Sequence, residues 1–208
     1  MDNINISNIK FGNQFGYAEF FEWEKFTPEM QGEHLCRLVQ FSPDNPNKIR
    51  YARDTNNLIG VTTISSGYLT NNPQDWPYKY YISPYGDLCL EKKEIAVANK
   101  EYDELNELAY IATYKSEIYV PAVNAIYKND TQYIPRGSRA EWVQVIMMGQ
   151  CILRDNGECK PGEYCTLYKG DDQNLFGTVV PATPFDSLKI YILQRLYTNS
   201  IICLLKNI

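Results

Sequence analysis

Two carboxylates lie close together near the N-terminus, in the aromatic segment GYAEFFEW that runs from Gly16 to Trp23. Glu19 and Glu22 are three positions apart. Such a pair can perform acid–base chemistry when one carboxyl group is buried, because burial raises the pKa of that group. On a chain with a net charge of −5, however, two carboxylates are more often solvated, so the pair alone does not identify an active site.

The chain has a single histidine, His34, which any Ser–His–Asp or Cys–His site would have to use. It lies in QGEHLC beside a charged turn, and no nucleophile signature of the GxSxG type occurs. A surface or core histidine is therefore the better interpretation. P-loop, HExxH, EF-hand and dinucleotide-binding spacings do not occur either, so the sequence predicts no cofactor.

Six cysteines are the remaining candidates for chemistry: Cys36, Cys89, Cys151, Cys159, Cys165 and Cys203. The N-terminus lacks the basic start and apolar stretch of a signal peptide, so we expect a reducing cytosol and free thiols. Cys159 and Cys165 flank the turn KPGEY and could supply two metal ligands. No CxxC or CxxH supplies the other two, so the sequence favours buried or turn-lining thiols and predicts no metal site.

Composition limits the classes of partner. Hydrophobic residues make up 44% and charged residues 22% of the 208 residues, which is typical of a globular protein. No stretch is strongly basic, and no apolar run approaches the ~20 residues of a membrane span, so we expect neither nucleic acid nor membrane as a partner. The 17 tyrosines suit strands and protein interfaces, although AT-rich coding explains them equally well.

The elements that must position these residues are mostly short strands. Runs rich in β-branched and aromatic residues, bounded by turn residues, predict strands over 35–41, 49–53, 58–65, 117–120, 142–154 and 164–168. Hairpins are predicted around 83–87, around the DNGE turn at 155–158, and between 188–197 and 200–206. Gly60, inside a strand, indicates a bulge or a close backbone approach.

One helix is predicted over 100–113, where Leu105, Leu108 and Ile111 recur at helical spacing after several acids. A βαβ rhythm is missing. The predicted fold class is therefore mainly β, a compact antiparallel domain of many short strands with one or two short helices.

Two blocks of sequence carry a resemblance to a known family. The first consists of GYAEFFEW, QGEHLCRLV, KIRYAR and LIGVTTIS, in that order. The second consists of YIPRGSRAEWVQVIMMGQCILRDNGECKPGEYC followed by IYILQRLYTNSIICLL. In order, spacing and closing hairpin, these blocks resemble the peptidase G2 family, the intramolecular chaperone autoproteolytic cleavage domain of phage neck-appendage and tail-spike proteins.

The resemblance covers most of the chain, from about Gly16 to Leu205, with a divergent middle at about 91–130. It implies an N-terminal arm over 1–15 and a peptidase G2-like domain over 16–208. Its most specific block contains Arg136, Arg139, Glu141 and Trp142.

The resemblance also implies a chemistry. Members of the family help a spike form trimers and then cut the chain just before an Asp in a motif resembling D-x-A-E-x-F-E-W, with that Asp and the Glu three residues on as catalytic groups. Here the Glu is Glu19, the Asp position is Gly16, and Phe15 precedes the scissile bond. Because glycine has no group that moves a proton, we expect self-cleavage to be lost and Glu19 to be vestigial. The other residues of the segment are then expected to serve packing: Tyr17, Phe20, Phe21 and Trp23.

The leading expectation is a non-enzymatic virion component, associated with a capsid, tail or appendage, that self-associates as a trimer and is assembled in the host cytoplasm. Only 15 residues precede Gly16, so we expect them to dock the domain onto other virion proteins. Arg136, Arg139 and Glu141 are candidates either for a subunit contact or for a local salt-bridge network. The alternatives are a working autoproteolytic chaperone and, more weakly, a receptor- or glycan-binding module.

Overall fold

A computed structural model of the chain describes residues 16–26, 33–102, 108–128 and 132–206, and side chains within these ranges outside 98–113. The predicted arm over 1–15, including Phe15, lies outside the described residues. The chain divides into two compact units: Met1–Asn72 together with Ile134–Ile208, and Pro73–Tyr133. The segment of weakest family resemblance, 91–130, falls in the second unit.

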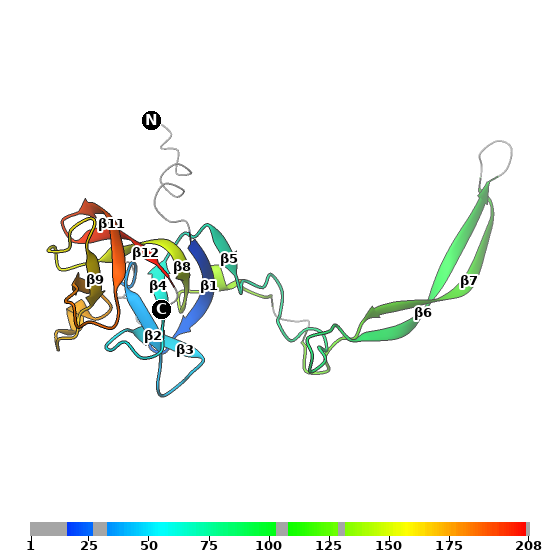
Figure 1. The fold of residues 1–208 in the computed structure, drawn as a ribbon. Helices are drawn as coiled ribbons and strands as arrows, with labels where there is room; N and C mark the ends of the chain where they lie inside the picture. The colour runs from blue at the N-terminus through cyan, green and yellow to red at the C-terminus, as the bar shows by residue number, and fades with distance from the viewer. Residues whose placement is uncertain (1–15, 27–32, 103–107, 129–131, 207–208) are drawn as a thin grey trace. The chain divides into compact units, whose positions relative to one another are not determined.

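The first unit is built on one mixed sheet of ten described strands, in the order β10-β9-β11-β12-β8-β4-β2-β3-β1-β5 (Figure 1). These strands are β1 (Gly16–Trp23), β2 (Leu38–Phe41), β3 (Lys48–Tyr51), β4 (Leu58–Thr63), β5 (Tyr68–Thr70), β8 (Trp142–Arg154), β9 (Tyr164–Leu167), β10 (Val179–Pro181), β11 (Ile190–Tyr197) and β12 (Ser200–Leu205). The sheet is mixed because β1 pairs parallel with β3 and β5. Two 3-10 turns, η2 (Arg136–Ser138) and η3 (Gln173–Leu175), complete the unit.

The long strand β8 organises this sheet. Its first half pairs with β1 on one side and β4 on the other, so β8, β4, β2, β3 and β1 form a closed ring of five strands. Its second half pairs with β12, and β11, β9 and β10 follow in that order beyond β12. The register of β8 shifts at Met147, opposite the step from Tyr17 to Ala18. Val145 and Ile146 are adjacent and both buried, because they belong to clusters on opposite faces of the sheet. One strand therefore contributes to two cores.

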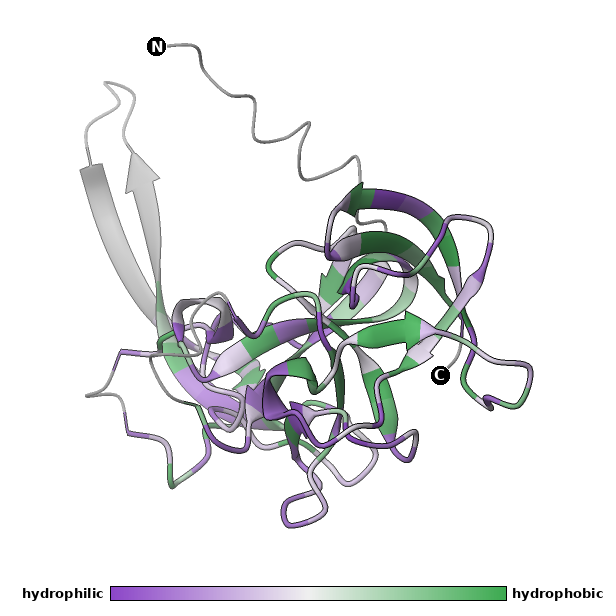
Figure 2. Cartoon of the chain, turned by 90° about the vertical axis from the view of Figure 1, so that its left-hand side faces the viewer, coloured by the Kyte–Doolittle hydropathy of each residue, from purple (hydrophilic) through white to green (hydrophobic). Residues whose placement is uncertain are grey.

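The two cores are apolar clusters on the two faces of the sheet. Figure 2 shows hydrophobic residues, in green, along its strands. Val143 and Val145 belong to the smaller cluster, which also contains Trp23. Ile146 and Leu153 belong to the larger one. Gly60 lies at a register shift between β2 and β4, and a Cβ there would overlap the carbonyl oxygen of Ile146. The predicted bulge or close approach is thus confirmed.

The second unit contains a two-stranded antiparallel ribbon, β6 (Leu90–Tyr102) with β7 (Leu108–Pro121), which Figure 1 shows as a long twisted hairpin. A tight turn precedes it, in which Ile82 pairs with Leu88 and Gly86 has a φ of +91°. The hairpin predicted around 83–87 is therefore confirmed, as is the strand predicted over 117–120, which lies in β7.

The helix predicted over 100–113 is wrong, because its described residues belong to β6 and β7. Apolar residues at helical spacing over so short a run also fit a strand. Tyr110, Ile111 and Thr113 favour the extended backbone, and each has a cross-strand partner in β6. In the part of the chain that the structure describes there is no α-helix, so none has the length and apolar character needed to span a membrane.

The predicted mainly β class and the closing hairpin β11–β12 are confirmed. The hairpin predicted around 155–158 is wrong. The turn itself forms, with Gly157 at a φ of +90°, but β8 pairs with β12 and β9 pairs with β10 and β11. Asp155 at the start of the turn is held instead by Arg195 on β11, with a 2.7 Å hydrogen bond, and forms a parallel bridge with Val179 of β10.

Candidate functional site

The segment singled out by the sequence forms β1, and its first residue is tightly enclosed. Gly16 faces Gly149 across the antiparallel pair of β1 and β8. A Cβ on Gly16 would lie 2.5 Å from Cγ2 of Ile146 and 2.8 Å from the carbonyl oxygen of Met148. Carbon atoms in contact are normally about 3.5–4.0 Å apart, so a side chain at this position requires β8 to move. The position at which the resemblance places the catalytic Asp is therefore filled by a neighbouring strand.

Glu19, the second acid of the motif, is half-buried and engaged by its neighbours. The Tyr17 hydroxyl donates a hydrogen bond to its carboxylate, and Thr70 Oγ1 donates to the Tyr17 hydroxyl at 2.9 Å. The parallel pairing with β5 places these residues together, and it also stacks Tyr17 on Tyr68 with ring centroids 6.0 Å apart. The pKa of Tyr17 is raised, chiefly because its hydroxyl donates a hydrogen bond to Glu19, which favours the protonated form. Glu19 is thus a hydrogen-bond acceptor in a chain of polar groups.

Glu19 and Glu22 do not form a catalytic pair. Successive side chains of a strand point to opposite faces, so residues three apart lie on different faces of β1. Glu22 instead forms an ion pair with Lys48 of β3 at 2.7 Å. The strand period alone, read from the sequence, would have separated these two carboxylates.

The arginines of the second block gather around Trp142, the first residue of β8. The guanidinium carbons of Arg136 and Arg139 lie over its ring, 4.2 and 5.0 Å from the centroid. Arg136 also donates to the carbonyl oxygen of Asn71 at 2.7 Å, and Asn71 in turn donates to the carbonyl oxygen of Phe20 on β1 at 2.9 Å. These cation–π and hydrogen-bond contacts tie η2 and β8 to β1.

Arg139 and Glu141 form an ion pair of 3.8 Å within the chain. The local network that the sequence suggested is therefore present for these two residues. A contact of the same residues with another subunit stays a prediction.

The aromatic residues of β1 lie in packed positions. Phe20 and Trp23 are 4% and 2% exposed, and Phe21 meets Phe41 edge to face at 5.9 Å. The His34 ring, which is partly buried, lies edge to face against Trp23 with ring centroids 6.1 Å apart, a packing contact.

All six cysteines are free thiols. Four of them are buried: Cys151, Cys159, Cys165 and Cys203. Burial raises the pKa of the Cys151 thiol, so it stays protonated and unreactive. Within the described ranges, no group of three or more His, Cys, Asp or Glu residues is placed to hold a metal ion.

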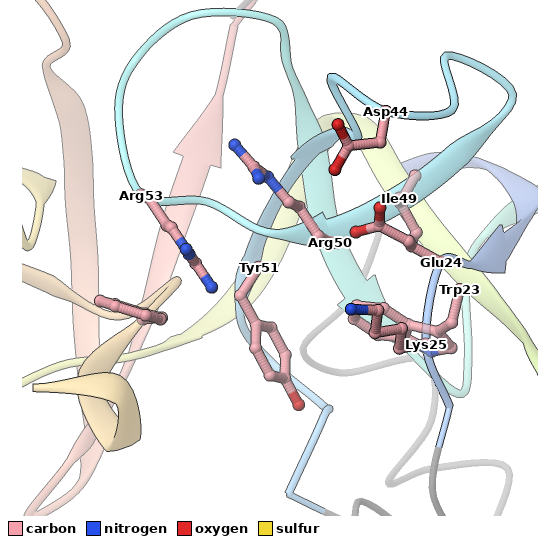
Figure 3. A pocket seen from close by; sticks show the side chains of 9 residues that line it. Trp23, Glu24, Lys25, Asp44, Ile49, Arg50, Tyr51 and Arg53 are labelled. Carbon is pink, nitrogen blue, oxygen red and sulfur yellow. The ribbon is translucent and has the colours of Figure 1, made fainter.

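A polar groove that sequence reasoning missed lies beside the end of β1 (Figure 3). It has a volume of about 310 Å³ and is lined by Trp23, Glu24, Lys25, Asp44, Ile49, Arg50, Tyr51, Arg53 and Phe176. The Arg50 Nε is buried without a hydrogen-bond partner, and the Arg53 guanidinium lies over Phe176 at 4.7 Å. Glu24 accepts a hydrogen bond from Ser42 at 2.7 Å. The signal in the sequence was KIRYAR, whose two arginines both line the groove.

Comparison with known proteins decides the family. Residues 4–180 match the family described as Peptidase_G2, IMC autoproteolytic cleavage domain. The chain belongs to the peptidase G2 family. This peptidase G2 chain is 25% identical over 207 residues to the pre-neck appendage protein of Bacillus phage B103, covering 90% of this chain and 21% of that relative. It therefore spans about a fifth of the length of that relative.

Solved structures show the same fold. The peptidase G2 chain resembles the pre-mature bacteriophage phi29 gene product 12 with a TM-score of 0.58 and 19% identity, over 92% of this chain and 21% of the other. It resembles the C-terminal fragment of that product with a TM-score of 0.56 and 20% identity, over 91% of this chain and 99% of the fragment. The family prediction made from the sequence is confirmed.

Proposed function

We propose that this chain is a structural component of a phage appendage, that it self-associates as a trimer in the virion, and that it does not cut itself. The family and the similarity to a pre-neck appendage protein support the appendage. Residues 1–15 are proposed to dock the domain onto other virion proteins during assembly in the host cytoplasm.

The packing of Gly16 is the observation that carries the loss of cleavage. In the family motif, an Asp at this position works with the Glu three residues on. Here the acid is absent, and the space next to the Gly16 Cα is occupied by Ile146 and by the main chain of Met148. Glu19 remains, but its carboxylate accepts a hydrogen bond from the Tyr17 hydroxyl rather than facing a second acid. A single carboxylate without its partner supports a packing role for β1.

Mass spectrometry of the expressed chain under denaturing conditions tests this proposal. We expect one species at the full mass of 24.1 kDa after prolonged incubation at high protein concentration, where oligomers form. The alternative function, an autoproteolytic chaperone, requires a fragment that begins at Gly16. Detection of that fragment would overturn the loss of cleavage and leave the family assignment intact.

A second candidate function is glycan binding, and one feature of the second unit favours it. A cleft of about 270 Å³ is lined by Trp76, Tyr78, Ile126, Tyr127 and Lys128. Tyr78 is 73% exposed, so its ring is accessible beside the lysine. Aromatic rings of this kind present an apolar face together with a polar edge. Titration with purified cell-wall oligosaccharides, followed by tryptophan fluorescence, tests this candidate. We expect saturable quenching in the wild type and not in the control variant Trp76→Ala. A wild type that shows no saturable quenching would remove glycan binding as a candidate.

A further inference from the structure

Two arginines of the KIRYAR segment differ from the other arginines of the chain. Among the described residues, the guanidinium groups of Arg50 and Arg53 have no hydrogen-bond or ion-pair partner. Both of these arginines line the polar groove beside the end of β1 (Figure 3). The other five arginines each have such a partner: Arg37, Arg136, Arg139, Arg154 and Arg195.

The protein holds both guanidinium groups in place without using their N–H groups. The Arg50 Nε is enclosed by protein, whereas the terminal nitrogens of this side chain stay accessible. The Arg53 guanidinium lies over the Phe176 ring, 4.7 Å from its centroid. Stacking on an aromatic face leaves the N–H groups at the edge of a guanidinium free to bind an acceptor. Two positioned donor groups therefore line one groove, and a ligand can supply the acceptor.

The charges of the groove favour an anionic ligand. Lys25, Arg50 and Arg53 carry three positive charges along its wall, and Glu24 and Asp44 carry two negative ones. The groove is thus positive, although the chain as a whole has a net charge of −5. Neither arginine is paired with these two acids in the described part of the chain, and Glu24 instead accepts a hydrogen bond from a serine hydroxyl at 2.7 Å. The positive charge is therefore available to a ligand.

The two acids also decide which anion fits. A dianion such as phosphate would bring a second negative charge close to Glu24 and Asp44, and like charges repel. A carboxylate carries a single charge, and its two oxygens match the planar fork of a guanidinium. The groove, with a volume of about 310 Å³, is small for a ligand pocket and suits one side chain of a longer ligand. Tyr51 and Phe176 supply apolar walls for the methylene groups beside a carboxylate.

We propose that this groove binds the carboxylate of an acidic peptide, with Arg50 and Arg53 as the residues that hold it. The methylene groups of the acidic residue pack against the aromatic walls, and the rest of the peptide stays outside the groove. The C-terminal carboxylate of a peptide has the same chemistry, so it is a second source of this ligand. The proposal does not depend on whether the chain cuts itself or forms trimers.

Proton–nitrogen correlation NMR of the full chain tests the proposal through the indole N–H of Trp23, a residue that lines the groove and is 2% exposed. The chain has three tryptophans, and the indole signal that is lost in Trp23→Phe identifies the one in the groove. We expect this signal to shift saturably with acetyl-Ala-Glu-Ala-amide and not with the neutral acetyl-Ala-Gln-Ala-amide. The signals of Trp76 and Trp142, which lie outside the groove, should stay in place.

Two further ligands separate the possible sources of the charge. Acetyl-Ala-Ala-Ala with a free C-terminal carboxylate represents chain ends, and inorganic phosphate represents dianions. Saturable shifts with either carboxylate peptide support the proposal, and the tighter of the two identifies the source. Equal shifts with the glutamate and glutamine peptides, no saturable shift with any peptide, or tighter binding of phosphate than of both carboxylate peptides would overturn it.

A matched pair of variants assigns the binding to the arginines. Arg50→Gln and Lys48→Gln each remove one positive charge from β3, but Lys48 does not line the groove. We expect Arg50→Gln to weaken binding of the glutamate peptide by about ten-fold or more, because a hydrogen bond between charged groups is lost. Lys48→Gln should leave the affinity within about two-fold of the wild type. An Arg50→Gln chain that keeps the Trp76 and Trp142 signals and the wild-type affinity would overturn the proposal.

Discussion

Substitution of Gly16 is expected to destabilise the first unit, and the cost can be worked out from the contacts of β1 with β8. In Gly16→Ala the new Cβ would lie 2.5 Å from Ile146 Cγ2 and 2.8 Å from the Met148 oxygen. Ile146 is fully buried and the oxygen belongs to the main chain of β8, so neither moves easily. Overpacking of this kind costs about 3 kcal/mol, at the upper end of the usual range.

Two further contributions set the net effect. Replacement of glycine by alanine restricts the unfolded chain, which returns about 1 kcal/mol. The net loss expected for Gly16→Ala is therefore about 2 kcal/mol of unfolding free energy. Gly16→Asp adds the desolvation of a carboxylate and is expected to be worse. Gly137→Ala is the matched control, because its Cβ would meet only the Phe20 ring, at 3.3 Å.

Urea unfolding, followed by tryptophan fluorescence, to which the buried Trp23 contributes, measures this difference. With a denaturant slope of about 2 kcal/mol per molar, Gly16→Ala should lower the midpoint by about 1 M, whereas Gly137→Ala should shift it little. Two results would refute the reasoning. One is a Gly16→Ala chain as stable as the wild type, which would mean that β8 relaxes freely. The other is a Gly16→Asp chain that folds and cuts itself.

Three further outcomes follow from polar and thiol groups. Asp155→Ala should lower the free energy of unfolding in urea by about 3 kcal/mol, because it leaves the Arg195 guanidinium without the buried carboxylate that it binds at 2.7 Å. Lys169→Ala removes a more exposed ion pair, with Asp186, and is the control. The pKa of Asp186 is lowered to about 2, first by the Thr183 amide and hydroxyl, so its contribution to stability is present above about pH 4 and is lost as the pH falls towards 2. In Asp186→Asn the urea midpoint should depend less on pH over that range. A pH dependence equal to that of the wild type would contradict the role assigned to Asp186. With a thiol reagent, at most the two partly exposed cysteines, Cys36 and Cys89, should react in the folded chain, and all six should react after denaturation.

Features that depend on neighbouring residues were predictable from the sequence. The closing hairpin β11–β12 follows from two apolar runs separated by a Thr-Asn turn, and the pair β2–β3 follows from the turn residues between them. The close approach at Gly60 was also predictable, because a glycine inside a β-branched run has few other uses. In each case the deciding interactions lie within a short stretch of chain.

Features that depend on partners distant in the sequence were not predictable from it. The turn after β8 carries a strong hairpin signal, but the pairing of β8 with β12 and the hold of Arg195 on Asp155 override it, and these contacts join residues some 40 positions or more apart. The helix predicted over 100–113 failed for a related reason. The spacing of its apolar residues fits either structure, and only the register of β7 against β6 decides between them.

The candidate site divides in the same way. That no acid stands at position 16, that Glu19 remains, and that the chain resembles the peptidase G2 family are all properties of the residues themselves, and the sequence alone determined them. Only the tertiary structure decided that β8 occupies the space beside Gly16, and that Thr70 from β5 donates to the Tyr17 hydroxyl, which donates to the remaining acid. Only the structure, too, decided that the charges around Trp142 bind within the chain. The physical reason is that a side chain carries its chemistry wherever it lies, whereas the room and the partners available to it are set by strands that are distant in the sequence.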